Sequence, residues 1–210
     1  MRNSAVTKAS ILRAAEEEFS AKGLYGARVE EIANRAKSNK RMIYEYYGNK
    51  EELYKSVIES VYARLSEREM SVLQENNDCE AAVESIIRMY YDFLSNDRNF
   101  VNIIMWENLN QAHYMKQSPN LSGLKNPLIT VLHKILEKGK AENKFRKDVD
   151  AEHLSIMLIT LTFSYFSNIY TLSHLMKIDM TEESRMHEHM NVVKKMLIDY
   201  IKEDSEEAAV

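Results

Sequence analysis

The sequence predicts an all-α protein with a three-helix head followed by a larger helical body. Only five glycines and two prolines occur in 210 residues, and neither type occurs from 49 to 118 or after Gly139. Loop-rich and all-β folds need these residues at their turns, so their scarcity favours helices. Apolar residues also recur at helical spacing, as in Leu53, Val57 and Val61.

Three short helices are expected in the first fifty residues. The first spans about Ser4–Ala21 and is followed by Gly23, which suits a left-handed C-terminal cap. The second spans about Val29–Ala36, and the third spans Lys40–Tyr47 with Asn39 as its N-cap. A three-residue turn joins the last two helices, which is the helix-turn-helix arrangement.

The third helix has one inward face and one face with polar tips. The inward positions are Ile43 and Tyr47, while Lys40, Arg41, Tyr44 and Tyr46 keep cationic or phenolic groups for a partner. These groups suit a groove rimmed by phosphates. Residues 1–50 carry ten Lys/Arg against six Glu, whereas residues 51–210 carry eighteen against twenty-six acidic residues. A basic head on an acidic body is consistent with one end facing phosphate.

The body is expected to begin with a long helix at about Lys50. Asp78 and Asp97 are predicted N-caps, and residues 118–127 are a predicted loop. The further helices are predicted at about 80–96, 99–117, 124–141, 151–177 and 181–203. The domains expected from this reading are a helix-turn-helix domain at 1–50, a helical domain at 51–203 and a disordered tail at 204–210.

The composition argues against an enzyme, a metalloprotein and a membrane protein. No Gly-rich phosphate loop, Gly-x-Ser-x-Gly motif or cysteine pair occurs, and no histidine has a glutamate three residues before it. His187 and His189 are two residues apart, which makes a poor metal site on a helix. The most apolar stretch, Leu154–Phe166, is too short to span a bilayer. A single cysteine, Cys79, and the lack of a signal-peptide pattern predict a protein of the reducing cytoplasm, without cofactors.

Four segments between Ile11 and Tyr54 carry a specific pattern: Gly23, Val29–Ala33, Asn39–Tyr44 and Lys50–Tyr54. In order and spacing they resemble the N-terminal domain of the TetR family of repressors. The resemblance implies a ligand-responsive transcriptional regulator, expected to be a repressor. Such a protein binds a palindromic operator in double-stranded DNA as a dimer and is released by a small-molecule effector.

The predicted DNA contacts lie in and around the second and third helices. They are Arg28, Ser38, Asn39, Lys40, Arg41, Met42, Tyr44, Tyr46 and Lys50. Arg41 lies near the N-terminus of the third helix and is expected to read a base. The resemblance places Tyr44 and Lys50 against the phosphate backbone.

Three positions depart from the family pattern. Lys37 stands in the turn where the family usually has glycine, which predicts either a left-handed backbone at Lys37 or a slightly different turn. Arg28 stands where a threonine often caps the second helix, so that cap is expected to be lost and a cation gained. Tyr47 replaces a common phenylalanine, and its hydroxyl needs water or a partner.

The predicted helix at 151–177 is apolar nearly all round, so it must be covered on several sides. Together with the helix at 181–203 it could form a four-helix homodimer interface, as the resemblance also implies. Phe166 is expected to contribute to this interface. The alternative is that the helix is central and buried within one chain.

The middle of the chain is rich in soft and aromatic side chains, which suit a cavity for an apolar or aromatic small molecule. The candidate lining residues are Tyr90, Phe93, Trp106, His113, Phe163 and Tyr170. Each of them could instead be an ordinary core residue. A second functional reading also remains open, in which the chain is a helical protein-interaction module that does not bind DNA.

Overall fold

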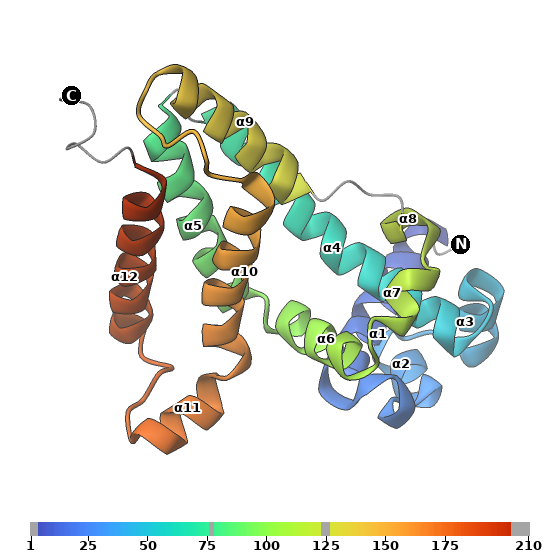
Figure 1. Cartoon of the computed structure of the whole chain (residues 1–210). Coiled ribbons are helices and arrows are strands. Elements are labelled where there is room, and N and C mark those ends of the chain that lie inside the picture. The colour runs from blue at the N-terminus through green and yellow to red at the C-terminus, as the bar shows by residue number, and fades with distance from the viewer. Residues whose placement is uncertain (1–3, 76–77, 123–126, 203–210) are drawn as a thin grey trace, which may run out of the picture. The chain divides into compact units, whose positions relative to one another are not determined.

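The computed structural model describes residues 4–75, 78–122 and 127–202, with all of their side chains except 73–75 and 122. Over these ranges the secondary structure is helical, apart from one isolated β-bridge between Phe145 and Lys202 (Figure 1). The all-α prediction is confirmed. The helices form two compact units. The first comprises the described residues within Met1–Arg64 and Asp97–Leu124, and the second those within Leu65–Asn96 and Lys125–Val210.

The first unit contains the predicted helix-turn-helix and three helices from the middle of the chain. Its helices are α1 (Ser4–Gly26), α2 (Val29–Arg35), α3 (Lys40–Tyr47), the first part of α4 (Lys50–Glu75), α6 (Arg98–Leu109), α7 (His113–Gln117) and α8 (Pro119–Ser122). Its core includes the fully buried side chains of Ile11, Phe19, Ile32, Ile43 and Tyr54. The predicted boundary between head and body at residue 50 stays a prediction.

Helix α6 packs against α1 at a glycine (Figure 1). Gly23 has φ +65°, and a Cβ atom added there would lie 2.9 Å from the ring of Trp106. The indole Nε1 of Trp106 donates to the carbonyl of Ser20 at 3.2 Å, and Asn102 Nδ2 donates to Ser20 Oγ at 3.2 Å. Both the backbone conformation and the close ring contact require glycine at position 23.

Arg64 of α4 joins three elements of the first unit. Its guanidinium donates to both carboxylate oxygens of Glu16 on α1, at 2.8 and 3.0 Å. It also donates twice to Asp97 Oδ2, at 2.7 and 3.1 Å. Because both ion pairs are partly buried and each is made through two hydrogen bonds, they hold α1, α4 and the start of α6 more firmly than an exposed ion pair would.

The predicted helix at 99–117 is divided into α6 and α7. Gln111 and Ala112 between them both adopt left-handed backbone, with φ of 57° and 55°. Ala112 cannot cap α7 with its side chain, and the buried Glu107 accepts a hydrogen bond from the backbone N–H of Met115 at 3.1 Å. The turn contains no glycine or proline, so the sequence carries no signal for it.

The second unit contains the end of α4 and five further helices. These are α5 (Cys79–Asn96), α9 (Pro127–Ala141), α10 (Ala151–Ser167), α11 (Ile169–Met176) and α12 (Glu183–Ile201). Helix α5 packs against α9, α10 and α12, and Figure 1 shows α5, α10 and α12 side by side. The predicted tail at 204–210 and the first residues of the predicted helix at 124–141 lie outside the described residues.

The predicted helix at 151–177 is two helices, so its extent was wrong. Helix α10 ends at Ser167, and α11 leaves it at an angle of 70°. The side-chain amide of Asn168 donates to the carbonyl of Ser164 at 3.0 Å, and such side chains compete with the helical backbone pattern. Among the described residues no single helix has the length and apolarity needed to cross a membrane. Helices α10 and α11 have that length and apolarity only when they are taken together across this bend.

Phe166 lies inside its own unit, contrary to the expectation that it faces a second copy. It is 2% exposed, and its ring lies 5.8 Å from that of Tyr91 and 5.2 Å from that of Tyr165. Tyr91 shares a hydrogen bond with His189 of α12, and burial lowers the pKa of this histidine. This aromatic cluster joins α5, α10 and α12, so substitution of Phe166 by a charged residue would disrupt folding first.

Three predicted N-caps are confirmed by hydrogen bonds from the first turn of each helix. The side chains of Asn39, Asp78 and Asp97 each accept from a backbone N–H three residues later at 2.9 Å. This is the geometry that favours Asn and Asp at N-caps.

A buried carboxylate in the second unit has a phenol as its hydrogen-bond partner. Glu69 of α4 is 3% exposed and accepts a hydrogen bond from Tyr90 of α5. No Lys, Arg or His among the described residues lies within 4.0 Å of its carboxylate. Burial raises the pKa of Glu69 to about 7, although the hydrogen bond from Tyr90 acts in the opposite direction.

Substitution of Glu69 by Gln is expected to stabilise the fold above pH 7 and to have little effect near pH 4.5. The unfolded chain releases this proton near pH 4.5 and the folded chain near pH 7, so Glu69 lowers the stability progressively across that window. The loss amounts to at most about 3 kcal/mol, and Gln keeps an acceptor for Tyr90 without a charge. Urea unfolding of both proteins between pH 5 and 8 measures the difference.

Glu67 is exposed on the same helix, so Glu67→Gln serves as the matched control and should show no such trend. A stability difference between Glu69→Gln and the unmodified protein that stays constant over this pH range would contradict the prediction.

Candidate nucleic-acid interface

The turn between α2 and α3 is held by backbone hydrogen bonds and by α1. Ser38 N donates to the carbonyl of Ala33 at 2.9 Å, and Ser10 Oγ of α1 donates to the carbonyl of Ala36 at 3.2 Å. Lys37 has φ of 49°, so of the two predicted alternatives the structure has the left-handed backbone. The turn therefore keeps its geometry without glycine.

The N-terminus of α2 lacks a side-chain cap at Arg28, as predicted. The backbone N–H of Arg28 instead donates to Glu18 Oε1 of α1 at 3.2 Å. Burial opposes ionisation of Glu18, but hydrogen bonds from Lys22 and from Arg28 outweigh it and hold the pKa of this carboxyl below its usual range. The Arg28 side chain remains exposed, as a phosphate contact requires.

The two predicted faces of α3 are confirmed. Ile43 is fully buried, and Tyr47 is partly buried with its hydroxyl donating to the carbonyl of Lys8 at 2.9 Å. The hydroxyl that Tyr47 adds in place of the family's phenylalanine thus has a hydrogen-bond partner, and burial raises the pKa of Tyr47. On the other face Lys40, Arg41 and Tyr44 are exposed, with Tyr44 at 45%.

The remaining predicted contacts lie close to this face. Ser38 and Met42 are partly buried and joined by a 3.6 Å contact between Ser38 Oγ and Met42 Sδ, while Asn39 is occupied as the cap of α3. Tyr46 is partly buried. Lys50 begins α4, whose first turn is capped by Asn49 through a hydrogen bond from Glu52 N at 2.8 Å.

Lys8 is a cation at this surface that sequence reasoning missed. Its ammonium lies 5.3 Å from the centre of the Tyr46 ring, which is within range of a cation–π contact. The backbone carbonyl of Lys8 accepts the hydrogen bond from the Tyr47 hydroxyl, so Lys8 of α1 contacts α3 at two points. Nothing near Lys8 in the sequence signals this, because its place depends on how α1 packs against α3.

The two cations at the start of α3 differ in their surroundings. Lys40 forms an ion pair with Glu30 of α2. Arg41 is exposed, and among the described residues no carboxylate lies within 4.0 Å of its guanidinium. Arg41 is therefore available to a DNA base without first breaking a contact within the protein.

The six predicted ligand-binding residues are divided between the two units. Trp106 and His113 lie in the first, where Trp106 packs on α1 and His113 is exposed beside Gln117. The other four lie in the second: Tyr90 contacts Glu69, Phe93 and Phe163 are partly buried, and Tyr170 is 69% exposed. The ligand pocket stays a prediction.

A groove of about 300 Å³ lies between α5 and α12 of the second unit, apart from these six residues. Its lining is mixed in charge over an apolar floor of Ile87 and Met190, with Glu84 and Lys194 ion-paired at 3.4 Å. The remaining lining residues are Arg88, Asp92, His187 and Asn191.

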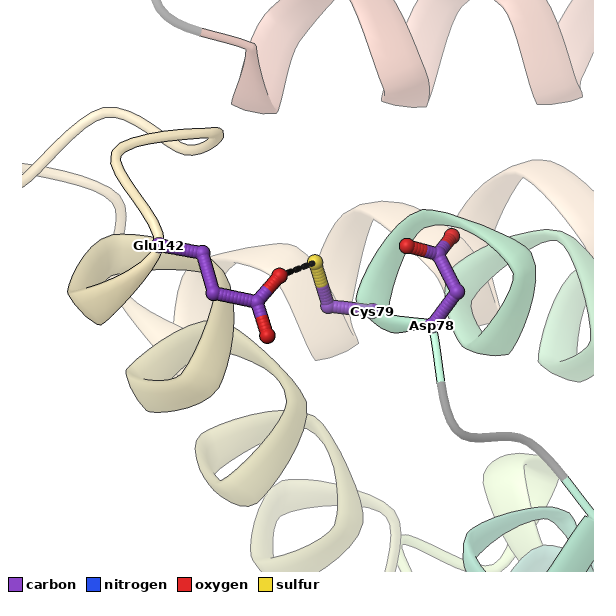
Figure 2. A group of neighbouring side chains, drawn as sticks. All are labelled: Asp78, Cys79 and Glu142. Atoms are coloured by element: carbon purple, nitrogen blue, oxygen red, sulfur yellow. Dashed lines mark hydrogen bonds between the residues drawn. The ribbon is translucent and has the colours of Figure 1, made fainter.

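Three potential metal ligands gather at the start of α5: Asp78, Cys79 and Glu142 (Figure 2). The Cys79 thiol donates to Glu142 at 3.7 Å, and burial raises its pKa, which disfavours the thiolate that metals bind. Lys144 lies 2.7 Å from Asp78 and 2.9 Å from Glu142, and its hydrogen bonds lower the pKa of both carboxyls. An ammonium thus already supplies the positive charge, which favours a structural role.

Both parts of the chain match known families. The family described as "Bacterial regulatory proteins, tetR family" matches residues 11–57, and "Tetracyclin repressor-like, C-terminal domain" matches residues 80–197. The HTH-type transcriptional repressor NicS of Pseudomonas putida is 34% identical over 192 residues, which cover 91% of each chain. The HTH-type transcriptional repressor SCO4008 of Streptomyces coelicolor is 35% identical over 108 residues, 51% of this chain and 53% of that protein.

Solved structures share the fold at low sequence identity. A TetR transcriptional regulator from Chloroflexus aurantiacus superimposes with a TM-score of 0.74 at 13% identity, covering 97% of this chain and all of the other. FadR from Bacillus subtilis in complex with stearoyl-CoA gives 0.68 at 18% identity, covering 92% of this chain and 99% of the other. The two family matches and the similarity to NicS show that the chain belongs to the TetR family of helix-turn-helix, DNA-binding transcriptional regulators, which are not enzymes.

Proposed function

We propose that this protein is a homodimeric transcriptional repressor that binds a palindromic operator through α3 of each copy and is released by a small-molecule effector. The observation that carries the proposal is the surface of α3. It presents an exposed Arg41, which pairs with no carboxylate among the described residues, beside Tyr44 on a helix whose other face is anchored by Ile43. The similarity to the repressor NicS over 91% of the chain supports repression rather than activation.

In this proposal each α3 enters a major groove, and the two half-sites lie roughly 34–36 Å apart, one helical turn of DNA. Arg41 bonds O6 and N7 of a guanine, a bidentate contact that reads sequence. Lys50, Tyr44, Arg28 and Lys8 contact phosphates, which fix the register and supply affinity without reading sequence. The protein acts in the cytoplasm, where the operator lies.

Release is proposed to pass through α4. This helix is continuous from Lys50, beside α3, to Glu75, and so it crosses from the first unit into the second. An effector bound in the body that tilts α4 would change the separation of the two heads. A coupling free energy of about 1–3 kcal/mol is enough to change operator occupancy severalfold.

The dimer is proposed to form through α10 and α12. Ile156 and Ile159 of α10 are 62% and 36% exposed, and Val192 and Met196 of α12 are 55% and 51% exposed. Each pair is three or four residues apart, so it lies on one face of its helix. Apolar side chains gathered in this way favour burial against a second copy.

Substitution of Arg41 by Ala is expected to cost roughly 1–3 kcal/mol per half-site and to relax the preference at one base position. Lys50→Ala should weaken binding to all sequences alike and flatten the dependence of log K on log salt by about one unit per contact. Fluorescence anisotropy across a salt series measures both variants. The probes are the duplex that the unmodified protein selects from a random pool and a scrambled duplex.

Equal losses of affinity for both duplexes in Arg41→Ala would make Arg41 one more phosphate contact. If the unmodified protein selected no sequence and showed no salt-dependent binding, the chain would be a protein-interaction module instead.

Substitution of Ile156 by Glu is expected to convert the dimer to a monomer, because a charge would replace an apolar contact at the interface. Light scattering should give twice the chain mass of 24.5 kDa for the unmodified protein and 24.5 kDa for the variant. Leu109→Glu is the matched control, since Leu109 is also exposed, at 74%, but lies in the first unit. A mass of 24.5 kDa for the unmodified protein would refute the dimer.

A small apolar or aromatic molecule is expected to raise the thermal stability and to weaken operator binding. The physical reason is that a ligand which binds one conformation preferentially shifts the population toward it. A thermal-shift screen of aromatic acids, aromatic amines and fatty acyl-CoA thioesters, followed by anisotropy, measures both effects. Compounds that stabilise the protein but leave operator affinity unchanged would show binding without regulation.

A further inference from the structure

An ion pair spans the turn between the two helices of the helix-turn-helix. Glu30 lies in the first turn of α2, and Lys40 is the first residue of α3. Their side chains are 55% and 49% exposed, so both groups reach the protein surface. Of the two adjacent cations on α3, Lys40 is paired with Glu30, whereas Arg41 has no carboxylate partner within the described part of the chain.

The ion pair is not needed to hold α2 and α3 together. Ile32 and Ile43 are both fully buried and provide the apolar contact of the two helices with the core of the head. The turn is closed by the hydrogen bond from Ser38 N to Ala33 O. An exposed ion pair contributes little to folding, since water screens it and its side chains lose freedom. Its effect must therefore be sought at the surface.

A carboxylate on the face that meets DNA opposes binding, because the phosphates are negative. Its repulsion is the same for every sequence, as is the attraction of a lysine for phosphate. A lysine held by Glu30 no longer releases a counterion from DNA, and counterion release dominates non-specific binding. The ion pair thus reduces the sequence-independent part of the affinity, while the bidentate contact from Arg41 to a base is left intact.

The geometry points to Glu30 as a specificity-determining residue that holds the Lys40 ammonium away from phosphate, so that Arg41 decides which DNA is bound. This inference rests on the proposed function, since it requires that α3 faces the major groove. Discrimination is a difference between two binding free energies, so a lower affinity for competing DNA increases it as effectively as a higher affinity for the operator.

The test compares Glu30→Gln with Glu31→Gln. Both substitutions remove one negative charge from the first turn of α2, but only Glu30 contacts Lys40. Anisotropy measures the Kd of the full-length protein for the duplex it selects from a random pool and for a scrambled duplex, each across a salt series. Glu30→Gln should bind scrambled DNA about tenfold more tightly, with a salt slope steeper by about one unit per released lysine.

The selected duplex should gain less than scrambled DNA, so the ratio of the two affinities falls in Glu30→Gln and stays unchanged in Glu31→Gln. The double variant Glu30→Gln/Lys40→Gln should lose the gain, which would assign it to Lys40. Equal behaviour of the two single variants would overturn the inference. A loss of affinity confined to the selected duplex would also overturn it, because Glu30 would then be reading a base itself. If the unmodified protein selects no sequence, the proposed function fails, a result distinct from either of these.

Discussion

Contact between the indole of Trp106 and the backbone of Gly23 joins α6 to α1, and the first unit is organised around α1. No residue with a Cβ atom fits between this ring and this left-handed backbone. Nearer its other end, α1 supplies the carbonyl of Lys8 to Tyr47 of α3. One helix therefore contacts both α3 and a segment from the middle of the chain, which makes residues 97–122 part of the same compact unit as the helix-turn-helix.

Buried carboxylates in the two units are stabilised differently. Glu18, which is fully buried in the first unit, lies 2.8 Å from Lys22 and accepts from the Arg28 backbone, so it stays ionised and orders the start of α2. Glu69 of the second unit accepts a hydrogen bond from the neutral phenol of Tyr90 and has no cation beside it among the described residues, and burial raises its pKa to about 7. Desolvation of a charge is offset only where an opposite charge or enough donors compensate it. The first unit thus gains local order from its ions, while Glu69 can take up a proton near neutral pH.

The proposed function assigns affinity and specificity to different groups at the surface of α3. Lys8, held over Tyr46, adds positive charge from α1, and the charge of Lys40 is balanced by Glu30. Arg41 alone of the two cations on α3 meets no carboxylate within 4.0 Å among the described residues. An arrangement of this kind limits the non-specific attraction of a basic head for DNA, which would otherwise hold the protein at countless wrong sites.

Features set by neighbours in the chain were predictable from the sequence alone. The three head helices, the caps at Asn39, Asp78 and Asp97 and the two faces of α3 depend on contacts within about four residues. The predicted DNA contacts and ligand pocket remain predictions. Tertiary structure decided the inward position of Phe166, the place of Lys8 and the pairs Glu30–Lys40 and Glu69–Tyr90. Apolar periodicity marks a side chain as buried but does not say what covers it, and partners distant in the sequence are chosen only when the helices pack.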